Sequence, residues 1–455
     1  MWRFGASRAL ILVASTHLLA CGFPPPADVP GPAQDAEPGC RVDDDCTSVA
    51  GRPICQVATA TCVGCLDATT CPTDKPSCDR DEHACRGCVS DDECASGICI
   101  EADGTCADAG ATVFVSSVGT DIGDCKEATP CATIPFALQR VTPIRRVMRV
   151  VGDFLNDGAS QPTFVIDRSL TIDFGGTTLP RPGNGAVFSL VSPASVVTIE
   201  GVTLTGPLTS PPITEAPAVI VGTGIALRLF NSTITGSGVE VANGTLDARN
   251  LKVAASVIRC TSGTLLIRDS TFSASKTNYT NCQTTITKNR FDLAPDAAFQ
   301  GQGGVLTFEN NVLIVNSEFS DLISTGGHAP GSVIAFNTIV NTATVLKSPA
   351  ALSCDATFTI TSNIIAYHST APILGQGCIV RASLFDLEGA AAAPGNPSGD
   401  ASTFFKSRAS GDFHLATASP ALNVGEPNIV TSDFDGNPRP APAGSRPDVG
   451  AYEAP

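Results

Sequence analysis

The chain has 455 residues, a formal net charge of −16, five histidines and a single tryptophan. An acidic chain of this kind is repelled by nucleic acids and by anionic membranes, so neither is expected as an electrostatic partner. The 19 cysteines would be unusual in a reducing cytosol and indicate an exported, disulfide-bonded protein.

The chain begins with an export signal. Residues 1–8 carry two arginines and no acid, and residues 9–20 are almost wholly apolar, which is too short for a bilayer span of about 20 residues. Leu18-Leu19-Ala20-Cys21 resembles the bacterial lipobox, in which the cysteine becomes the lipidated first residue; an ordinary signal peptide with a chance cysteine is the alternative. Gly22 resembles the sorting pattern of the outer membrane. We therefore expect a signal peptide over residues 1–20 and a lipid on Cys21 as the membrane anchor. The expected location is the outer membrane, with the protein facing the cell exterior.

A tether and a cysteine-rich region follow the anchor. Residues 21–38 are rich in proline and fit a tether. Residues 39–107 hold twelve cysteines in three units, and each unit of about 23 residues is too small to bury a core, so disulfides are its natural source of stability. Four cysteines allow three pairings, among which the sequence does not choose. The units are Cys40, Cys46, Cys55 and Cys62; Cys65, Cys71, Cys78 and Cys85; and Cys88, Cys94, Cys99 and Cys106.

Other interpretations of this region have less support. The CxxC spacings of Cys62/Cys65 and Cys85/Cys88 suggest zinc or redox chemistry, but each pair straddles a unit boundary and no βαβ pattern surrounds it. The acidic stretches 43–45 and 91–93 suggest calcium, with solvated turns as the plainer account. The region resembles short cysteine-rich repeats near the amino ends of exported proteins from myxobacteria and their relatives. We expect a stalk or contact module without a metal or other cofactor.

From residue 111 onward, short β-branched and aliphatic runs alternate with Gly, Asn, Ser and Thr, and residues 134–141 form the one good helix candidate. A turn residue recurs at steps of 19 to 27 residues. A β-sandwich has no reason to repeat one motif in this way, whereas a parallel β-helix stacks the same position about 4.8 Å from its neighbour in each coil. The recurring residues are Asn231, Asn250, Asp269, Asn289, Asn316, Asn337 and Asn363. The flanking residues expected to stack inside are Phe230, Phe272, Phe291, Phe319, Phe336 and Ile364.

The remaining cysteines agree with this coil length. Cys260 and Cys282 are 22 residues apart and Cys354 and Cys378 are 24 apart, so each pair is predicted to bridge adjacent coils. Cys125 and Cys131 are predicted to close a small loop before the helix.

Both ends of this domain carry a family resemblance. Residues 113–138 (VFVSSVGTDIGDCKEATPCATIPFAL) resemble the opening of right-handed parallel β-helix proteins of the pectate-lyase-like superfamily. Residues 412–453, with SPALN, DFDGNPR and DVGAYE, resemble the closing segment of the same group. The resemblance implies an all-β fold over residues 111–455, a right-handed parallel β-helix with an N-terminal cap (111–147) and a closing segment (412–455).

A lyase of this superfamily is expected to show carboxylates that hold calcium beside an arginine or lysine base. The nearest candidates are Arg249, Arg268 and Lys288, each of which directly precedes a recurring turn residue, so we expect them to share one face. Such a row would grip an acidic sugar chain; the alternative is a solvated row paired with neighbouring acids.

No set of catalytic residues stands out. Glycoside hydrolysis needs two carboxyl groups about 5–9.5 Å apart, and no spacing singles out a pair among the acids of the middle coils. The acids of the closing segment have an implied structural role, and the histidines are isolated. The mature chain keeps no tryptophan for stacking on sugars. The candidate acids are Glu200, Asp247, Asp269, Glu309, Glu318 and Asp321, and those of the closing segment are Asp433, Asp435, Asp448 and Glu453.

The sequence therefore predicts a surface-exposed lipoprotein whose β-helix is a non-catalytic binding or adhesion scaffold, with a polysaccharide or another cell-surface ligand as the candidate partner. The alternative is a polysaccharide lyase or glycoside hydrolase. A flat surface of Ser, Thr and Asn favours the scaffold, and a groove with converging carboxylates and a base favours the enzyme.

The lipobox supplies the first testable prediction. The substitution Cys21→Ser removes the lipidated atom, so the protein should move from the membrane fraction to the soluble fraction in a fractionation followed by immunoblotting. Unchanged membrane association would contradict the lipid anchor.

Overall fold

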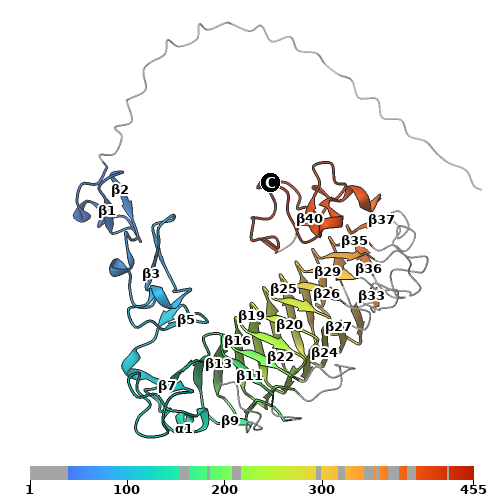
Figure 1. Ribbon diagram of the computed structural model, residues 1–455. Helices are drawn as coiled ribbons and strands as arrows, with labels where there is room; N and C mark the ends of the chain where they lie inside the picture. Colours follow the sequence, from blue (N-terminus) through green and yellow to red (C-terminus); the bar gives the residue numbers. More distant parts are fainter. Residues whose placement is uncertain are drawn as a thin grey trace, which may run out of the picture.

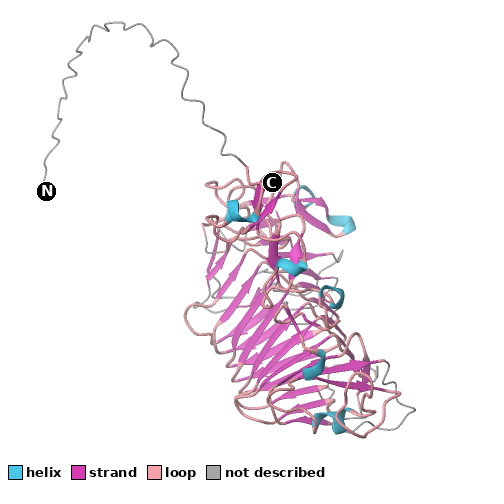
Figure 2. Ribbon diagram, turned by 90° about the vertical axis from the view of Figure 1, so that its left-hand side faces the viewer, coloured by secondary structure: helices cyan, strands magenta, loops and turns pink. Residues whose placement is uncertain are grey.

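The computed structural model describes residues 39–152, 163–181, 185–206, 217–293, 299–315, 323–342, 352–353, 359–366, 379–386, 396–427 and 430–455. Three parallel sheets wind into a β-helix, the cysteine-rich region leads into its first coil, and the closing segment lies near its far end (Figure 1). Turning the molecule by 90° shows the strands stacked in register along the helix axis (Figure 2). Among these residues, no helix has the length and apolar character that a membrane span requires.

From β8 to β35, strands of the three sheets alternate along the chain as it winds from coil to coil. The 12-stranded sheet contains β7 (Thr112–Ser116), β8 (Val147–Val151), β10 (Leu170–Asp173), β13 (Val196–Glu200), β16 (Ala226–Phe230), β19 (Thr245–Arg249), β22 (Thr264–Arg268), β25 (Gln283–Thr287), β28 (Leu306–Glu309), β31 (Val333–Ala335), β34 (Thr359–Thr361) and β36 (Ile379–Arg381). The 11-stranded sheet contains β11 (Thr178–Pro180), β14 (Thr203–Thr205), β17 (Thr233–Thr235), β20 (Lys252–Ala254), β23 (Thr271–Ser273), β26 (Arg290–Leu293), β29 (Val312–Val315), β32 (Thr338–Asn341), β35 (Ile364–Ala366), β37 (Leu384–Asp386) and β38 (Ser398–Gly399). The 9-stranded sheet contains β9 (Phe164–Ile166), β12 (Phe188–Leu190), β15 (Val219–Val221), β18 (Gly238–Ala242), β21 (Val257–Thr261), β24 (Lys276–Thr280), β27 (Phe299–Gln302), β30 (Ile323–Gly326) and β33 (Leu352–Ser353).

Each strand pairs in parallel with the strand one coil further on. β16 pairs with β19 and β19 with β22, with Leu227, Leu246 and Leu265 at the same level. Because side chains alternate between the two faces of a strand, these positions point inward and are fully buried. The parallel β-helix expected from the sequence is confirmed.

Short elements complete the two ends. α1 (Ile134–Leu138) directly follows Thr133, whose hydroxyl accepts a hydrogen bond from Phe136 N. The helix ends before residue 141, which is the end of the predicted range. The cysteine-rich region contains β1 (Ile54–Gln56), β2 (Thr61–Val63), β3 (Ser77–Asp79), β4 (Ala84–Arg86), β5 (Cys99–Ile100) and β6 (Thr105–Cys106), and the closing segment contains β39 (Phe405–Ser407) and β40 (Asp412–Leu415). The 3₁₀ turns are η1 (Asp43–Cys46), η2 (Ala68–Thr70), η3 (Asp91–Glu93), η4 (Ala109–Ala111), η7 (Ala401–Thr403) and η8 (Arg408–Ser410).

Every cysteine-rich unit uses the same pairing. The first cysteine of a unit bonds the third, and the second bonds the fourth. The structure also joins Cys125 to Cys131 and Cys260 to Cys282, with Cα–Cα distances of 4.8 and 6.3 Å. These are the two pairs expected from loop and coil length, whereas Cys354 and Cys378 lie outside the described residues.

The aromatic interior differs in part from the expectation. Phe272 stacks on Phe291 with ring centroids 4.7 Å apart, and Phe291 contacts Phe308 within the core. Phe230, by contrast, is buried against the cysteine-rich region, because it is the last residue of β16 and points outward. Ile364 packs against the closing segment, and Phe336 lies beneath the guanidinium of Arg439. Phe319 lies outside the described residues.

The recurring turn residues occupy two adjacent positions of one corner, between the 12-stranded and 11-stranded sheets. Asn231, Asn250 and Asp269 have positive φ, which is the left-handed conformation that a short polar residue tolerates. The residue after this position is buried, and in the later coils it is an asparagine. The expected single row is therefore wrong by one residue for three of its seven members, Asn289, Asn337 and Asn363. Asn316 lies outside the described residues, and Asn311 takes the position expected for it. The buried asparagines are Asn289, Asn311, Asn337 and Asn363.

These four side chains form an amide ladder along the corner. The amide nitrogen of Asn337 donates to Phe308 O at 2.8 Å and to Asn363 Oδ1 at 2.9 Å, and its oxygen accepts from Asn311 N at 2.8 Å. Each amide thereby satisfies backbone groups of two coils in a place that water does not reach.

We expect Asn337→Ala to lower the free energy of unfolding by roughly 3 kcal/mol, because it leaves several buried donors and acceptors without partners. Chemical denaturation with the disulfides intact measures this. The control is Asn243→Gly, which removes an exposed amide while keeping the positive φ and should change stability by less than about 0.5 kcal/mol. Equal effects of the two substitutions would contradict a stabilising ladder.

Candidate functional site

The expected basic row lies on the outer face of the 12-stranded sheet. Arg249 and Arg268 end β19 and β22 and are register partners. Both guanidinium groups contact the carboxylate of Asp247, at 3.2 and 3.3 Å, and Arg249 also lies over the Phe230 ring. The two cations thus share one anion, which reduces their combined attraction for an acidic ligand.

Lys288 does not belong to this row, which corrects the expected register. The partner of Arg268 on β25 is Thr287, and Lys288 follows it in the left-handed corner position with a φ of 56°. The step from Arg268 to Lys288 is one residue longer than the step from Arg249 to Arg268, so the lysine leaves the sheet face. The basic row therefore holds two of its three expected members.

Asp247 and Glu309 of the same sheet do not form a hydrolytic pair. Asp247 lies on β19 and Glu309 on β28, three strands apart, which corresponds to roughly 14 Å at the spacing of paired strands. That separation exceeds the 5–9.5 Å that glycoside hydrolysis needs. Burial raises the pKa of Glu309, and Glu200 is covered by the cysteine-rich region. Glu318 and Asp321 lie outside the described residues.

A groove runs along the corner between the 9-stranded and 12-stranded sheets, with a volume of about 570 Å³. All of its lining residues are uncharged. Thr245, Thr264 and Gln283 are the first residues of β19, β22 and β25, and they repeat at one level of successive coils. The remaining lining residues are Gly224, Ile225, Ala226, Asn243, Gly244, Ser262, Gly263, Asn281, Gly304 and Val305.

Glycines make this groove possible. A Cβ atom on Gly263 would lie 2.4 Å from the carbonyl oxygen of Gly244, and one on Gly304 would lie 2.1 Å from that of Cys282. Side chains at these positions would therefore push adjacent coils apart. The lining combines glycine backbone with hydroxyl and amide side chains, so it offers hydrogen bonds without charge.

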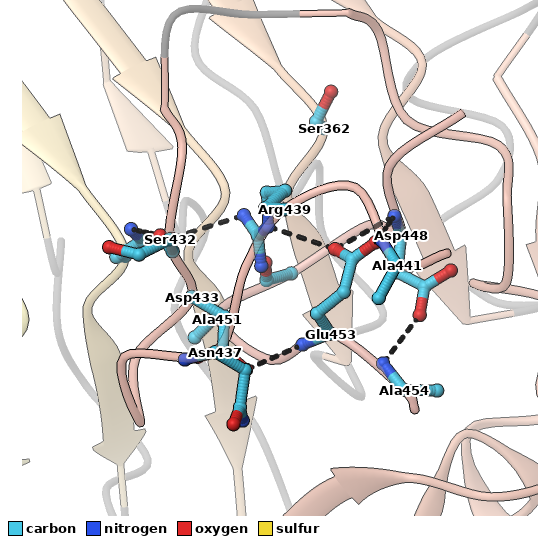
Figure 3. A network of polar contacts seen from close by, with 12 residues as sticks. Ser362, Ser432, Asp433, Asn437, Arg439, Ala441, Asp448, Ala451, Glu453 and Ala454 are labelled. Carbon is cyan, nitrogen blue, oxygen red and sulfur yellow. Dashed lines mark hydrogen bonds and ion pairs between the residues drawn. The ribbon is translucent and has the colours of Figure 1, made fainter. Parts of the chain in front are cut away.

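The acids of the closing segment are held by internal contacts (Figure 3). Asp433 accepts hydrogen bonds from Asn437 N and Glu453 N, and Asp448 accepts from Asn423 N and Ala454 N, all between 2.7 and 3.0 Å. Arg439 lies 2.9 Å from Glu453. These carboxylates hold the closing segment together, because their oxygens accept hydrogen bonds or pair with a cation inside the segment.

His414 forms a clamp that sequence reasoning missed. Its Nδ1 lies 2.5 Å from Asp412 and its Nε2 lies 2.7 Å from Asp435, and its ring packs on Tyr452. Burial disfavours the imidazolium, but the two carboxylates outweigh this effect and raise the pKa of His414. Asp412 is two residues away in sequence, whereas Asp435 is brought close only by the fold.

Comparison with known proteins assigns neither a family nor a function to this chain. No known protein family matches the chain, and no curated protein does so. Among solved structures, the chain is similar to pectate lyase Pel9A, with 12% identity and a TM-score of 0.32 over 76% of this chain and 96% of that chain. At this level of similarity, no residue role transfers from the lyase.

The His414 clamp predicts a pH dependence of stability. Because the folded state raises the pKa of His414, the clamp contributes fully below the ordinary value of about 6.5, and its contribution disappears as the pH rises through the folded pKa. The difference in melting temperature between the wild type and His414→Gln should therefore shrink between pH 6 and pH 9, as calorimetry would measure. Asp435→Asn, which removes one carboxylate, should weaken the same trend. A difference that grows with pH would contradict the clamp.

Proposed function

We propose that the protein is a non-catalytic binding scaffold of the bacterial surface, held by a lipid on Cys21 in the outer membrane and facing the exterior. The corner groove would bind a neutral glycan chain. The observation that carries this proposal is the set of hydroxyl and amide side chains that line the groove at one level of successive coils, without a charged residue among them.

The chemistry of the groove fits this ligand. Sugar hydroxyls both donate and accept hydrogen bonds, as do the Thr and Ser hydroxyls and the Asn and Gln amides of the lining. Binding across several coils multiplies weak contacts along a linear chain. The buried ladder on another corner keeps the coils stacked, so the lining groups are held in place before a ligand arrives.

The alternative is a polysaccharide lyase or hydrolase. One observation favours it: Glu240 and Arg259 are register partners on the outer face of the 9-stranded sheet, which places an acid beside a base. Turnover assays separate this candidate from the scaffold.

The test combines binding and turnover. We expect the purified chain to bind a member of a panel of neutral glycans, and the double substitution Thr245→Val and Thr264→Val to weaken that binding roughly 10-fold, because each valine removes a hydroxyl without changing the shape. The control is Thr271→Val on the 11-stranded sheet, outside the groove, which should bind as the wild type does. Calorimetry provides the affinities.

The same panel, extended to uronate polymers with calcium, should yield neither unsaturated nor new reducing sugar ends. Turnover that is lost in Arg259→Ala would contradict the scaffold proposal and support the enzyme instead. Binding of uronates that weakens with salt and is lost in Arg249→Ala or Arg268→Ala would assign the ligand contact to the basic pair instead of the groove.

A further inference from the structure

The third cysteine-rich unit is docked on the β-helix. Ile98, Ile100 and Ala102 of this unit form an apolar cluster with Phe114 of β7 and Phe230 of β16. The unit therefore covers the outer face of the 12-stranded sheet at its amino-terminal end. Docking buries aromatic side chains that point away from the core of the β-helix.

Charged contacts cross the same interface. Arg149 of β8 contacts Asp91 of the unit and also Asp173 of its own sheet. Arg228 of β16 lies 2.6 Å from Asp103 and donates to Ala102 O at 2.9 Å. Each cation near the interface is thus already matched by at least one carboxylate.

Glu200 lies in the middle of this interface without a cation of its own. It ends β13, with Asp173 and Phe230 as its register partners, and only 3% of it is exposed. Oε2 accepts a hydrogen bond from Ala102 N at 3.3 Å, while Oε1 is buried and has no partner among the described residues.

The charges around Glu200 are mainly acidic. Burial, together with the charges of Glu101 and Asp103, raises the pKa of Glu200 to about 7, although the Ala102 amide and Arg149 act in the opposite direction. Glu101, which contacts Asn231, has a raised pKa as well, because of burial and the nearby Asp91. The other charged groups of the interface are Asp91, Asp173 and Arg228.

We propose that the third cysteine-rich unit is a pH-responsive clasp, which is closed on the β-helix while Glu200 is protonated and opens when Glu200 releases its proton to solvent. Its physical basis is a carboxyl group enclosed between two parts of the chain, with one oxygen that lacks a donor. A protonated carboxyl tolerates this environment, whereas a carboxylate is strongly destabilised there.

The direction of the effect follows from linkage. In the open state Glu200 faces water and titrates near its ordinary value, so the closed state binds the proton more tightly. Closure is strongest when the pH is below the ordinary pKa of Glu200. It is lost as the pH rises toward the pKa that Glu200 has in the closed state. The contact of Asp91 with Arg149 persists over this range: burial acts to raise the pKa of Asp91, but the hydrogen bonds from Arg149 and from the Cys99 amide lower it below its ordinary value.

Hydrogen exchange of the purified chain tests the clasp. We expect the protection of the amides of residues 98–106, corrected for the intrinsic pH dependence of exchange, to fall on the order of 70-fold between pH 5 and pH 8. Glu200→Gln, which resembles the protonated acid, should keep the protection nearly constant. The control Glu240→Gln, on the outer face of the 9-stranded sheet, should retain the fall seen in the wild type.

A second variant covers the case in which glutamine is not tolerated at position 200 and protection is low at every pH. Glu101→Gln removes one neighbouring negative charge and leaves Glu200 intact, so the fall should become smaller. The clasp would be overturned if protection fell by the same factor in the wild type and in Glu200→Gln. If Glu200→Gln is poorly protected at every pH, the clasp would be overturned if protection fell by the same factor in Glu101→Gln as in the wild type. Because no glycan is present, the outcome is independent of the proposed function.

Discussion

The structure depends on how each coil satisfies its buried backbone groups at the corner between the 12-stranded and 11-stranded sheets. The chain turns there within two residues, and the second residue lies in the interior. In the later coils one buried asparagine amide per coil satisfies these groups, and each amide is bonded to the coils on either side. These asparagines are Asn289, Asn311, Asn337 and Asn363. In the earlier coils the hydroxyls of Ser232 and Ser270 accept the same type of backbone bond. The groove, the basic pair and both covers are arranged on coils that this corner holds in register.

The period of this fold is readable from the sequence, but its phase is not. The steps between the recurring residues predict the length of one coil, and that length predicts the Cys260–Cys282 disulfide. The left-handed position and the ladder position are adjacent and both suit asparagine, for different physical reasons: one needs tolerance of positive φ and the other needs a buried amide. A pattern of asparagines alone therefore cannot distinguish them, and the same one-residue ambiguity makes the expected position of Lys288 on the sheet face wrong.

The site was less predictable than the fold, because its parts are distant in sequence. The groove consists of ordinary Ser, Thr, Asn and Gly positions that become one lining only when five coils are stacked. The contacts Glu200–Ala102 and His414–Asp435 join residues 98 and 21 positions apart, and no local pattern marks them. The spacing of the acids singles out no catalytic pair. The register places Asp247 and Glu309 three strands apart and makes Asp173 and Glu200 neighbours, although these two are distant in sequence.

The two covers of the β-helix use buried carboxylates in opposite ways. In the closing segment, Asp433 and Asp448 receive backbone N–H groups and Arg439 pairs with Glu453, so charge in the interior is compensated by donors that cannot move away. Thr361 and Asn310 then bond this segment to the coils beneath it. Glu200 receives one amide from the third cysteine-rich unit, and that amide is lost whenever the unit departs. A carboxylate compensated within its own segment makes a permanent cover, whereas one that depends on the docking partner makes the cover sensitive to its ionisation. The β-helix thus has a fixed cover at its carboxyl-terminal end and, through Glu200, a releasable one at the end that connects to the other cysteine-rich units.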